Sequence, residues 1–327
     1  MIPTLLPVDA RALFERVRKR KILVVGDLML DEWIWGTVTR ISPEAPVPVV
    51  TVSDHSFTLG GAGNVANNLR ALDAGVCFAG TVGDDAFAAQ VRDLLRREQV
   101  DDAGVLTVRD RPTTRKTRIV AHNQQVVRSD WESVESLAAG DRAQIAEFVR
   151  ARAAESDAVI CSDYAKGLFS REIVEAALAC PLVVADPKPQ NIDLFTGSTC
   201  VAPNAQEAAL IAGIARVDDE TLPLVGERLL SRLRCRYVLI TRGEHGMALF
   251  GKSGERLEIP SVARTVYDVS GAGDTVSAVL TLALAAGAPI ELAVQLANFA
   301  AGAVVEKLGT ATASADEILA LLDASHQ

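Results

Sequence analysis

The chain has 327 residues, of which 49% are apolar, and its formal net charge is −9. This length suits one large α/β domain or two smaller ones. The acidic balance, with no basic stripe, argues against a nucleic-acid-binding protein. The longest apolar run, 278–288, is too short to span a bilayer, and the N-terminus lacks the pattern of a secretory signal. We therefore expect a cytoplasmic protein with neither a nucleic-acid nor a membrane partner.

Five scattered cysteines without a C-x-x-C pair argue against a disulfide framework and a zinc site. The first predicted elements are an amphipathic helix over 9–20 and a buried parallel strand over 22–25. Asp27 and Asp31 follow that strand, at the end where open α/β sheets bind their ligands. They are candidates for binding substrate hydroxyl groups, with turn formation as the alternative.

Two stretches, 33–58 and 113–130, combine strand-like patches with prolines or polar turns. They interrupt an otherwise regular alternation of strands and helices. We predict that together they form a small sheet that acts as a lid. Apolar strands such as 47–52 also suggest an edge that pairs with another chain, so a homodimer through the lid is expected.

The rest of the chain alternates between strand and helix patterns. This alternation predicts one domain over 1–327, with a doubly wound, mostly parallel α/β sheet and helices on both faces. The expected strands are 76–82, 158–162, 182–185, 199–202 and 237–241, with a hairpin of 247–250 and 256–259. The expected helices are 62–73, 84–99, 141–154, 170–179, 204–213, 220–233, 271–287 and 289–307.

Gly246–Ser253 matches the P-loop pattern G-x-x-x-x-G-K-[ST] in every position. A P-loop needs a small-residue interior and a helix directly after the Lys-Ser pair. Here the interior is Met-Ala-Leu-Phe and the following residues are strand-like. We therefore predict that this segment is a hairpin and does not bind phosphate.

Gly61–Ala66 fits the dinucleotide fingerprint G-x-G-x-x-[GA], but polar residues precede it in place of a buried first strand. A close approach of the backbone at Gly61 to a polar ligand explains the glycines better. Asn64 could then offer a donor and an acceptor to a sugar hydroxyl. Helix capping by Asn64 is the alternative.

A third glycine motif, Asp268–Asp274, leads directly into an apolar helix. Gly271, Ala272 and Gly273 can direct backbone N–H groups at one anion, and Asp274 lies in the first helical turn. There it could accept a proton from a hydroxyl that attacks the anion. The alternative is a helix start whose acid only complements the helix dipole.

Four separated segments, in the same order along the chain, resemble the signatures of the ribokinase-like (PfkB) carbohydrate kinases, and the resemblance covers nearly all residues. The segments are Gly60–Leu69, Asn204–Glu207, Thr241–Gly246 and Asp268–Asp274. The resemblance implies an ATP-dependent sugar kinase. It places the catalytic base on Asp274 and the anion hole on Gly271, Ala272 and Gly273.

The resemblance also implies a nucleotide site and two cation sites. Residues carried over to the nucleotide are Asn204, Glu207, Thr241, Gly243, Gly271, Gly273, Asn298 and Gly302. Mg²⁺ would lie near Glu207, through water, and a monovalent ion such as K⁺ near Asp268 and Ser270. Val269 stands where many family members have Thr, which leaves the K⁺ dependence open.

Within the family, Gly26–Asp31, Arg40–Val49 and Arg118 resemble the heptose 7-phosphate kinases of lipopolysaccharide precursor synthesis, in their stand-alone form. This implies transfer of the γ-phosphate of ATP to the anomeric hydroxyl of D-glycero-D-manno-heptose 7-phosphate. The substrate's own phosphate then needs a second cationic pocket. Arg118 and Lys188 are the first candidates for it, followed by Lys116 and Arg128.

Three alternatives stay open from the sequence. The substrate could be fructose, ribose or a nucleoside. The chain could be an NAD-dependent oxidoreductase that uses Gly61–Ala66. It could also be a sugar or nucleotide sensor that keeps the fold without catalysis.

Overall fold

The computed structural model describes residues 4–122, 124–263, 265–307 and 309–326. Its centre is a nine-stranded sheet in the order β13-β12-β11-β10-β9-β8-β1-β4-β5, in which all neighbours are parallel except the antiparallel pairs β11–β12 and β12–β13. The strands are β1 (Lys21–Gly26), β4 (Gly75–Gly83), β5 (Asp101–Val108), β8 (Ala158–Ser162), β9 (Val183–Asp186), β10 (Cys200–Val201), β11 (Tyr237–Thr241), β12 (Met247–Gly251) and β13 (Arg256–Ile259).

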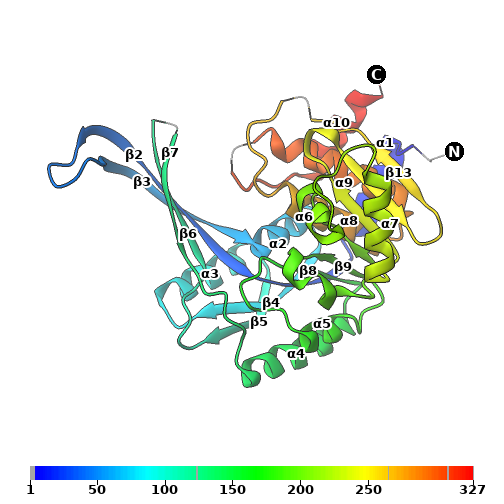
Figure 1. Cartoon of the computed structure of the whole chain (residues 1–327), viewed down its shortest axis with the longest axis horizontal. Coiled ribbons are helices and arrows are strands. Elements are labelled where there is room, and N and C mark those ends of the chain that lie inside the picture. Colours follow the sequence, from blue (N-terminus) through cyan, green and yellow to red (C-terminus); the bar gives the residue numbers. More distant parts are fainter. Residues whose placement is uncertain (1–3, 123, 264, 308, 327) are drawn as a thin grey trace.

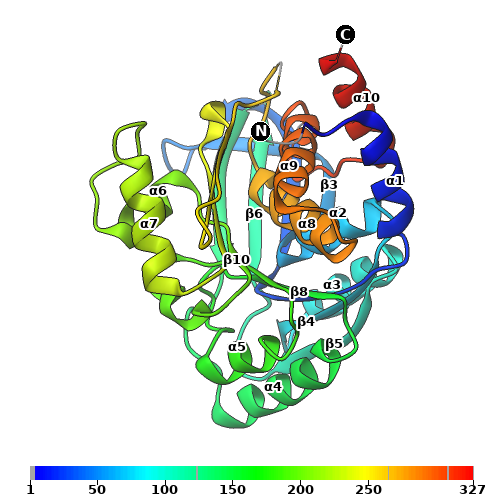
Figure 2. The ribbon, with the colours of Figure 1, turned by 90° about the vertical axis from the view of Figure 1, so that its right-hand side faces the viewer.

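Helices cover both faces of this sheet (Figures 1 and 2). Ile22 and Val24 of β1 pack into one apolar cluster with α1, α2, α3, α8, α9 and α10, whereas Leu23 and Val25 pack into a second with α4 and α5. A third cluster joins α6 and α7 to β11 and β12. The helices are α1 (Pro7–Val17), α2 (Ala62–Ala71), α3 (Ala86–Arg97), α4 (Ala139–Ala153), α5 (Arg171–Ala177), α6 (Ala205–Ala212), α7 (Leu222–Leu233), α8 (Ala272–Ala285), α9 (Ile290–Val305) and α10 (Ala315–Ser325), with short 3₁₀ turns η1 (Pro189–Phe195) and η2 (Gly243–His245). Among the described residues, no helix combines the length and apolarity needed to cross a membrane.

A separate four-stranded sheet, in the order β3-β2-β6-β7, projects from the body (Figure 1). It consists of β2 (Leu28–Ile41), β3 (Pro48–Gly61), β6 (Arg115–Ala121) and β7 (Gln124–Trp131). We call it the lid sheet. It is the small sheet that the sequence predicts for 33–58 and 113–130, except that β2 begins at Leu28, so Asp31 lies on a lid strand.

The two faces of the lid sheet carry different side chains, because successive residues of a strand point to opposite faces. Asp31 pairs with Lys116, which pairs with Asp130, so these three side chains share one face. Leu30 pairs with Arg115, which pairs with Trp131, so these three side chains share the other face. We call the first the inner face and the second the outer face.

The predicted fold class is confirmed, and each predicted helix and strand corresponds to an observed element. The sequence reading missed two elements, β5 and α10. Residues Asp101–Val108 begin with two acids and include a glycine, which are poor strand formers. The start of α10 did carry a signal: Ser314 and Glu317 form a capping box.

Gly26 ends β1 directly before Asp27, where the backbone is too crowded for any side chain. A Cβ atom at this position would lie 2.4 Å from Ala62 Cβ and 2.6 Å from the Ser162 carbonyl oxygen. Gly26→Ala should therefore lower the free energy of unfolding by about 1–3 kcal/mol, measured by urea denaturation. Gly140→Ala in α4 is the matched control, because a Cβ there meets nothing within 4 Å. Equal stability of the two variants would contradict this account.

Candidate active site

The carboxyl group of Asp274 is buried in the first turn of α8 and held by two donors. Its Oδ1 accepts a hydrogen bond of 2.6 Å from the Tyr164 hydroxyl, and its Oδ2 accepts one of 2.9 Å from Asn64 Nδ2. Burial raises the pKa of Asp274 to about 6, although both hydrogen bonds and the nearby Lys188 act in the opposite direction. A carboxylate with this pKa is suited to act as a general base near neutral pH.

The start of α8 provides the predicted anion site only in part. Gly271, with φ +80°, is the N-cap residue, and no side chain caps this helix. The Ala272 N–H donates to the Val269 carbonyl, so this amide is engaged within the turn. In the described part of the chain, the N–H groups of Gly271 and Gly273 have no such backbone acceptor. These two amides are free to bind an anion, whereas Ala272 is a weaker candidate than the sequence suggested.

The loop 163–166 after β8 positions Tyr164. Oδ2 of Asp27 accepts hydrogen bonds from the backbone N–H groups of Tyr164 (2.8 Å) and Lys166 (3.1 Å). Oδ1 of Asp163 accepts one from Ala165 N (2.8 Å). Burial raises the pKa of Asp27 to about 6. The structure thus gives Asp27 the task of holding this loop; direct binding of a substrate hydroxyl by Asp27 stays a prediction.

A small pocket of about 120 Å³ extends from Asp274 over the carboxyl ends of β9, β10 and β11. Lys188 Nζ forms an ion pair of 2.5 Å with Glu207 Oε1 inside it. Burial raises the pKa of Asp186 to about 8, while the adjacent Lys188 lowers it and Glu207 raises it. The lining residues include Tyr164, Asp186, Lys188, Asn204, Glu207, Thr241, Gly271, Gly273 and Asp274.

Asn204 and Glu207 form a capping box at the start of α6. Asn204 Oδ1 accepts from Glu207 N at 2.9 Å, and Glu207 Oε2 accepts from Asn204 N at 3.0 Å. This leaves the other Glu207 oxygen for Lys188. The sequence reading linked Lys188 to the phosphate of the sugar, but the structure places it in this pocket with the residues expected to bind the nucleotide.

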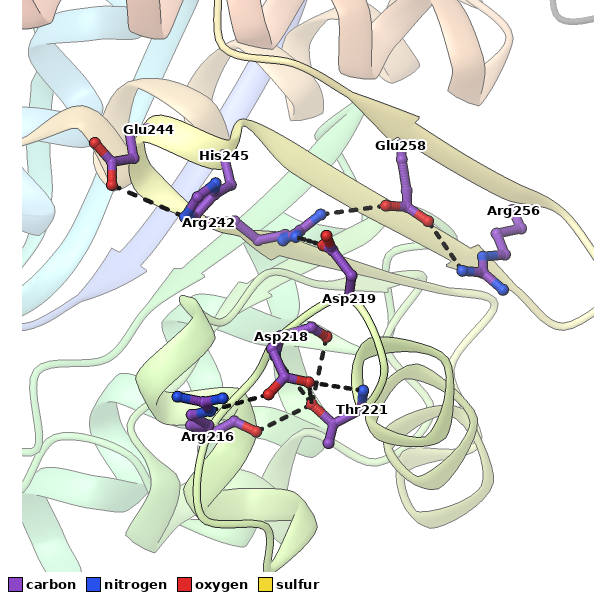
Figure 3. Close-up of polar contacts among 9 residues, drawn as sticks. All are labelled: Arg216, Asp218, Asp219, Thr221, Arg242, Glu244, His245, Arg256 and Glu258. Atoms are coloured by element: carbon purple, nitrogen blue, oxygen red, sulfur yellow. Dashed lines mark hydrogen bonds and ion pairs between the residues drawn. The ribbon is translucent and has the colours of Figure 1, made fainter.

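The turn after β11 is fixed by Arg242, as Figure 3 shows. Arg242 forms ion pairs with Asp219, before α7, and with Glu258 of β13 at 3.2 Å. Thr241, one residue earlier, lines the Asp274 pocket. Gly243 adopts φ +57° in the same turn. The turn is therefore held rigidly beside the pocket, as a nucleotide site requires.

Four other predicted residues have structural partners. Asn298 Nδ2 donates to the Pro260 carbonyl at 2.9 Å, and a Cβ on Gly302 would lie 2.8 Å from Val262 Cγ2. Both residues hold the segment after β13 against α9. Asp268 accepts from Ser270 N and Gly309 N, each at 2.9 Å, and these hydrogen bonds outweigh burial and lower the pKa of Asp268. Contacts of these residues with a nucleotide or K⁺ stay predictions.

The inner face of the lid sheet brings charged residues to the site. Arg118 Nη1 pairs with Asp31 Oδ1 at 2.7 Å and its guanidinium lies 4.9 Å from the centre of the Trp33 ring. Gly60 allows this arrangement, since a Cβ there would lie 2.4 Å from Asp31 Oδ2. Asp31 also acts electrostatically on Asp274. The structure therefore places Asp31, Asn64 and Arg118 near Asp274, and their contact with a substrate stays a prediction.

The alternative role of Asn64 as a helix cap is wrong. Asn64 lies inside α2, whose N-cap residue is Gly61, and its side chain is fully buried. Gly61 adopts φ +55° at the junction of β3 and α2.

The sequence reading missed Tyr164 and Asp186. Asp186 follows a buried strand, which was a usable signal, but nothing in the sequence relates Tyr164 to a residue 110 positions away.

The resemblance to carbohydrate kinases implies Mg²⁺ with ATP, and the charged side chains of the pocket suit the metal and the phosphates. The described residues contain no cluster of three or more His, Cys, Asp or Glu side chains that could enclose a metal. Mg²⁺ retains several waters and binds through one or two carboxylates together with substrate phosphates. Asp186 and Glu207 supply two carboxylates, and Lys188 supplies a cation for the phosphates.

The site combines a buried carboxyl group at a helix start with a lysine and two further carboxylates beside it. Such groups can position and stabilise the reactants of a phosphoryl transfer. The chain belongs to the pfkB family of carbohydrate kinases, which its residues 19–317 match. It is therefore an ATP-dependent sugar kinase.

The reading of Gly246–Ser253 as a hairpin is confirmed, because β12 and β13 are antiparallel neighbours.

Among curated relatives, the chain is 43% identical over 318 residues to bifunctional protein HldE of Citrifermentans bemidjiense, covering 95% of this chain and 65% of that protein. The chain is also 41% identical to the HldE of Geobacter sulfurreducens, and this match covers 97% of this chain and 66% of that protein. The chain thus spans just under two thirds of their length.

Among solved structures, the chain is similar to the tetrameric inhibited form of phosphofructokinase-2 from Escherichia coli, with a TM-score of 0.78 and 17% identity, covering 94% of this chain and 99% of that one. It is also similar to Arabidopsis thaliana ribokinase complexed with ribose and ATP, with a TM-score of 0.72 and 20% identity, covering 93% and 99%. At these identities the similarity shows the fold.

Tyr164→Phe tests how the base is held. The change removes a hydrogen bond that favours the charged carboxylate, so the pKa of Asp274 should rise above about 6. Because the base must be ionised, the acidic limb of the kcat–pH profile should move upward by about one unit, with a lower kcat. The profile is measured between about pH 5 and pH 9. Tyr237→Phe on β11 is the control; an unmoved limb in Tyr164→Phe would contradict the assignment.

Proposed function

We propose that this kinase transfers the γ-phosphate of ATP to the anomeric hydroxyl of D-glycero-D-manno-heptose 7-phosphate, giving the 1,7-bisphosphate. The sequence likeness to heptose 7-phosphate kinases supports the choice of sugar. A cationic group on the inner face of the lid sheet, Lys116, is the structural observation that carries it. Cytoplasmic ATP would serve this reaction.

Lys116 is a half-buried cation that lacks a close partner. Burial lowers the pKa of its ammonium group, while Asp130 and Asp31 raise it. Within the described ranges, no carboxylate lies within 4 Å of its Nζ, in contrast to Arg118, which pairs with Asp31, and Lys166, which pairs with Glu132 at 2.7 Å. Removing an ammonium group from water without a direct counter-ion is unfavourable. A phosphate on the substrate would supply that counter-ion.

Other cations lie close to Lys116. Arg128 and Lys166 both act electrostatically on it, and Arg128 stands opposite Arg118 in the β6–β7 pairing. Arg128 and Lys166 come from different segments, a lid strand and the loop that carries Tyr164. A substrate that bears its own phosphate would draw these groups together. An unphosphorylated hexose or a nucleoside offers nothing for them to bind.

The chemical roles follow from the contacts. Asp274 accepts the proton of the C1 hydroxyl as its oxygen attacks the γ-phosphorus, and ADP leaves. Lys188 and the N–H groups of Gly271 and Gly273 stabilise the charge on the transferred group. Asp186 and Glu207 would hold Mg²⁺, which would supply positive charge to the ATP phosphates. The lid sheet excludes water, which would otherwise accept the phosphoryl group.

Exposed apolar side chains on the lid strands support a homodimer. They are Ile41, Val52, Val126 and Val127, together with Val47 in the β2–β3 connection. Pairing of two lids would bury them. Sedimentation velocity should show a dimer, and Val52→Asp with Val127→Asp should convert it to a monomer. A monomeric wild type would contradict this part of the proposal.

Asp274→Asn tests the base. The amide keeps the shape of the side chain but cannot accept the proton, so kcat should fall about 10²-fold or more with little change in KM. Initial rates with ATP and heptose 7-phosphate give both constants. A variant that turns over as fast as the wild type would remove Asp274 from this role.

Lys116→Ala tests the sugar phosphate site. Its loss should raise KM for heptose 7-phosphate about 10-fold or more, because a charge-assisted hydrogen bond contributes roughly 1.5–3 kcal/mol. KM for ATP should stay unchanged. Lys252→Ala is the matched control, because Lys252 lies in Gly246–Ser253, the segment that matches the P-loop pattern. It should leave both constants unaltered. Wild-type turnover of fructose or ribose, but not of heptose 7-phosphate, would overturn the choice of substrate.

A further inference from the structure

A second cavity of the described residues lies outside the Asp274 pocket. It has a volume of about 670 Å³, within the range of small-molecule sites. Its walls are the turn from β4 into α3, the segment 109–113 between β5 and β6, and Arg115 and Trp131 of the lid sheet. It therefore lies at the point where the lid sheet joins the body.

This cavity belongs to the outer face of the lid sheet. Arg115 and Trp131 point to that face, whereas Asp31, Lys116 and Asp130 point to the inner face, toward the base. No residue that lines the Asp274 pocket also lines this cavity. A molecule bound here would not compete directly with either substrate.

Three arginines line the cavity, and two of them carry unused buried donors. Nη1 of Arg111 and Nε of Arg115 are buried and have no hydrogen-bond acceptor among the described residues. The Arg115 guanidinium is held 3.8 Å from the centre of the Phe87 ring and 3.4 Å from Glu32 Oε2. Arg109 is exposed at the same cavity. Buried donors without acceptors are costly, and an anion would satisfy them.

The acids of the cavity narrow the class of ligand. Asp85 is occupied, since it caps α3 and binds both the backbone N–H and the hydroxyl of Thr113. Asp84 and Asp110 are exposed and can accept hydrogen bonds from hydroxyl groups. A bare polyanion would be repelled by them. A small organic phosphate that carries hydroxyl groups would satisfy both the arginines and the acids.

Arg111 connects the cavity to the active site. Its Nη2 donates to the carbonyl oxygens of Lys166 (2.7 Å), Glu135 (2.7 Å) and Ser133 (3.3 Å). Lys166 belongs to the loop that presents Tyr164 to Asp274, and Asp27, which holds that loop, acts electrostatically on Arg111. An anion on Nη1 would act on the guanidinium group that fixes this loop.

We propose that the cavity at the root of the lid sheet is a regulatory site for a small hydroxylated organic phosphate, bound by Arg109, Arg111 and Arg115. Binding there changes the affinity for the sugar substrate through the contact between Arg111 and the Lys166 carbonyl. Its effect on turnover rests on the proposed kinase activity, but binding itself does not. The coupling is reciprocal, so the sugar must change the affinity of the effector by the same factor.

Glycerol 2-phosphate is the probe, titrated calorimetrically into the wild type and three variants. Arg109→Gln should weaken binding about 10-fold or more, because it removes a charged donor from an exposed position. Lys116→Ala, in the active site, and Arg150→Ala, an exposed arginine of α4, should bind as tightly as the wild type. Absence of binding to the wild type, or equal binding by wild type and Arg109→Gln, would overturn the proposal. Loss of binding in Lys116→Ala would place the probe in the active site and overturn it too.

Kinetics test the coupling separately. The probe should change the wild-type KM for the sugar by several-fold and leave KM unchanged in Arg109→Gln. Arg111→Lys keeps the charge but cannot reach three carbonyl groups, so it should reduce this change while retaining binding. An equal KM change in wild type and Arg109→Gln would contradict the regulatory role. If the wild type turns over no sugar, the calorimetric result still decides whether the site exists.

Discussion

The buried carboxylate of Asp274 is the constraint on which the site depends. A charge in this environment is tolerated only where donors or opposite charges lie beside it. Here Asn64 on α2 and Tyr164 on the loop after β8 donate hydrogen bonds, and Lys188 after β9 acts electrostatically. Burial raises the pKa of the carboxyl, and the donors keep it ionised near neutral pH. The same balance suits this carboxylate to act as the proposed base, and its hydrogen bonds hold these segments together.

The supports of these donors are themselves buried acids. Asp27 and Asp163 accept backbone N–H groups of the loop 163–166, and Asp163 also accepts from Lys188 N and Asn191 Nδ2. Burial raises the pKa of both carboxyl groups. The carboxyl ends of β1 and β8 therefore carry acids that position Tyr164 and Lys188 around Asp274. This arrangement explains why a parallel sheet concentrates function at one edge.

Local patterns predicted most of the fold, because buried strands and amphipathic helices are recorded in neighbouring residues. Asp274, Asn204 and Glu207 were also found from short motifs that precede helices. Tyr164 could not be found in this way. Its role depends on a contact between β8 and α8 that exists only after the sheet is assembled, and tyrosine in a loop has no chemical signature of its own. Lys188 was identified from the sequence as a candidate for the sugar phosphate. Its ion pair with Glu207 instead places it in the pocket beside Asp274.

Two other glycine motifs match patterns of phosphate or dinucleotide sites but lie in places that cannot perform this chemistry. Gly246–Ser253 runs along β12 and its turn, so its backbone N–H groups pair with a neighbouring strand or stabilise the turn. Gly61–Ala66 enters α2 from an antiparallel lid strand, and its Asn64 donates to the base. An anion site needs free amides at a helix start, with a charged partner nearby. Of these three motifs, only the one that ends in Asp274 meets both conditions, so the surrounding structure, and not a match to a glycine pattern, determines the chemistry of a glycine loop.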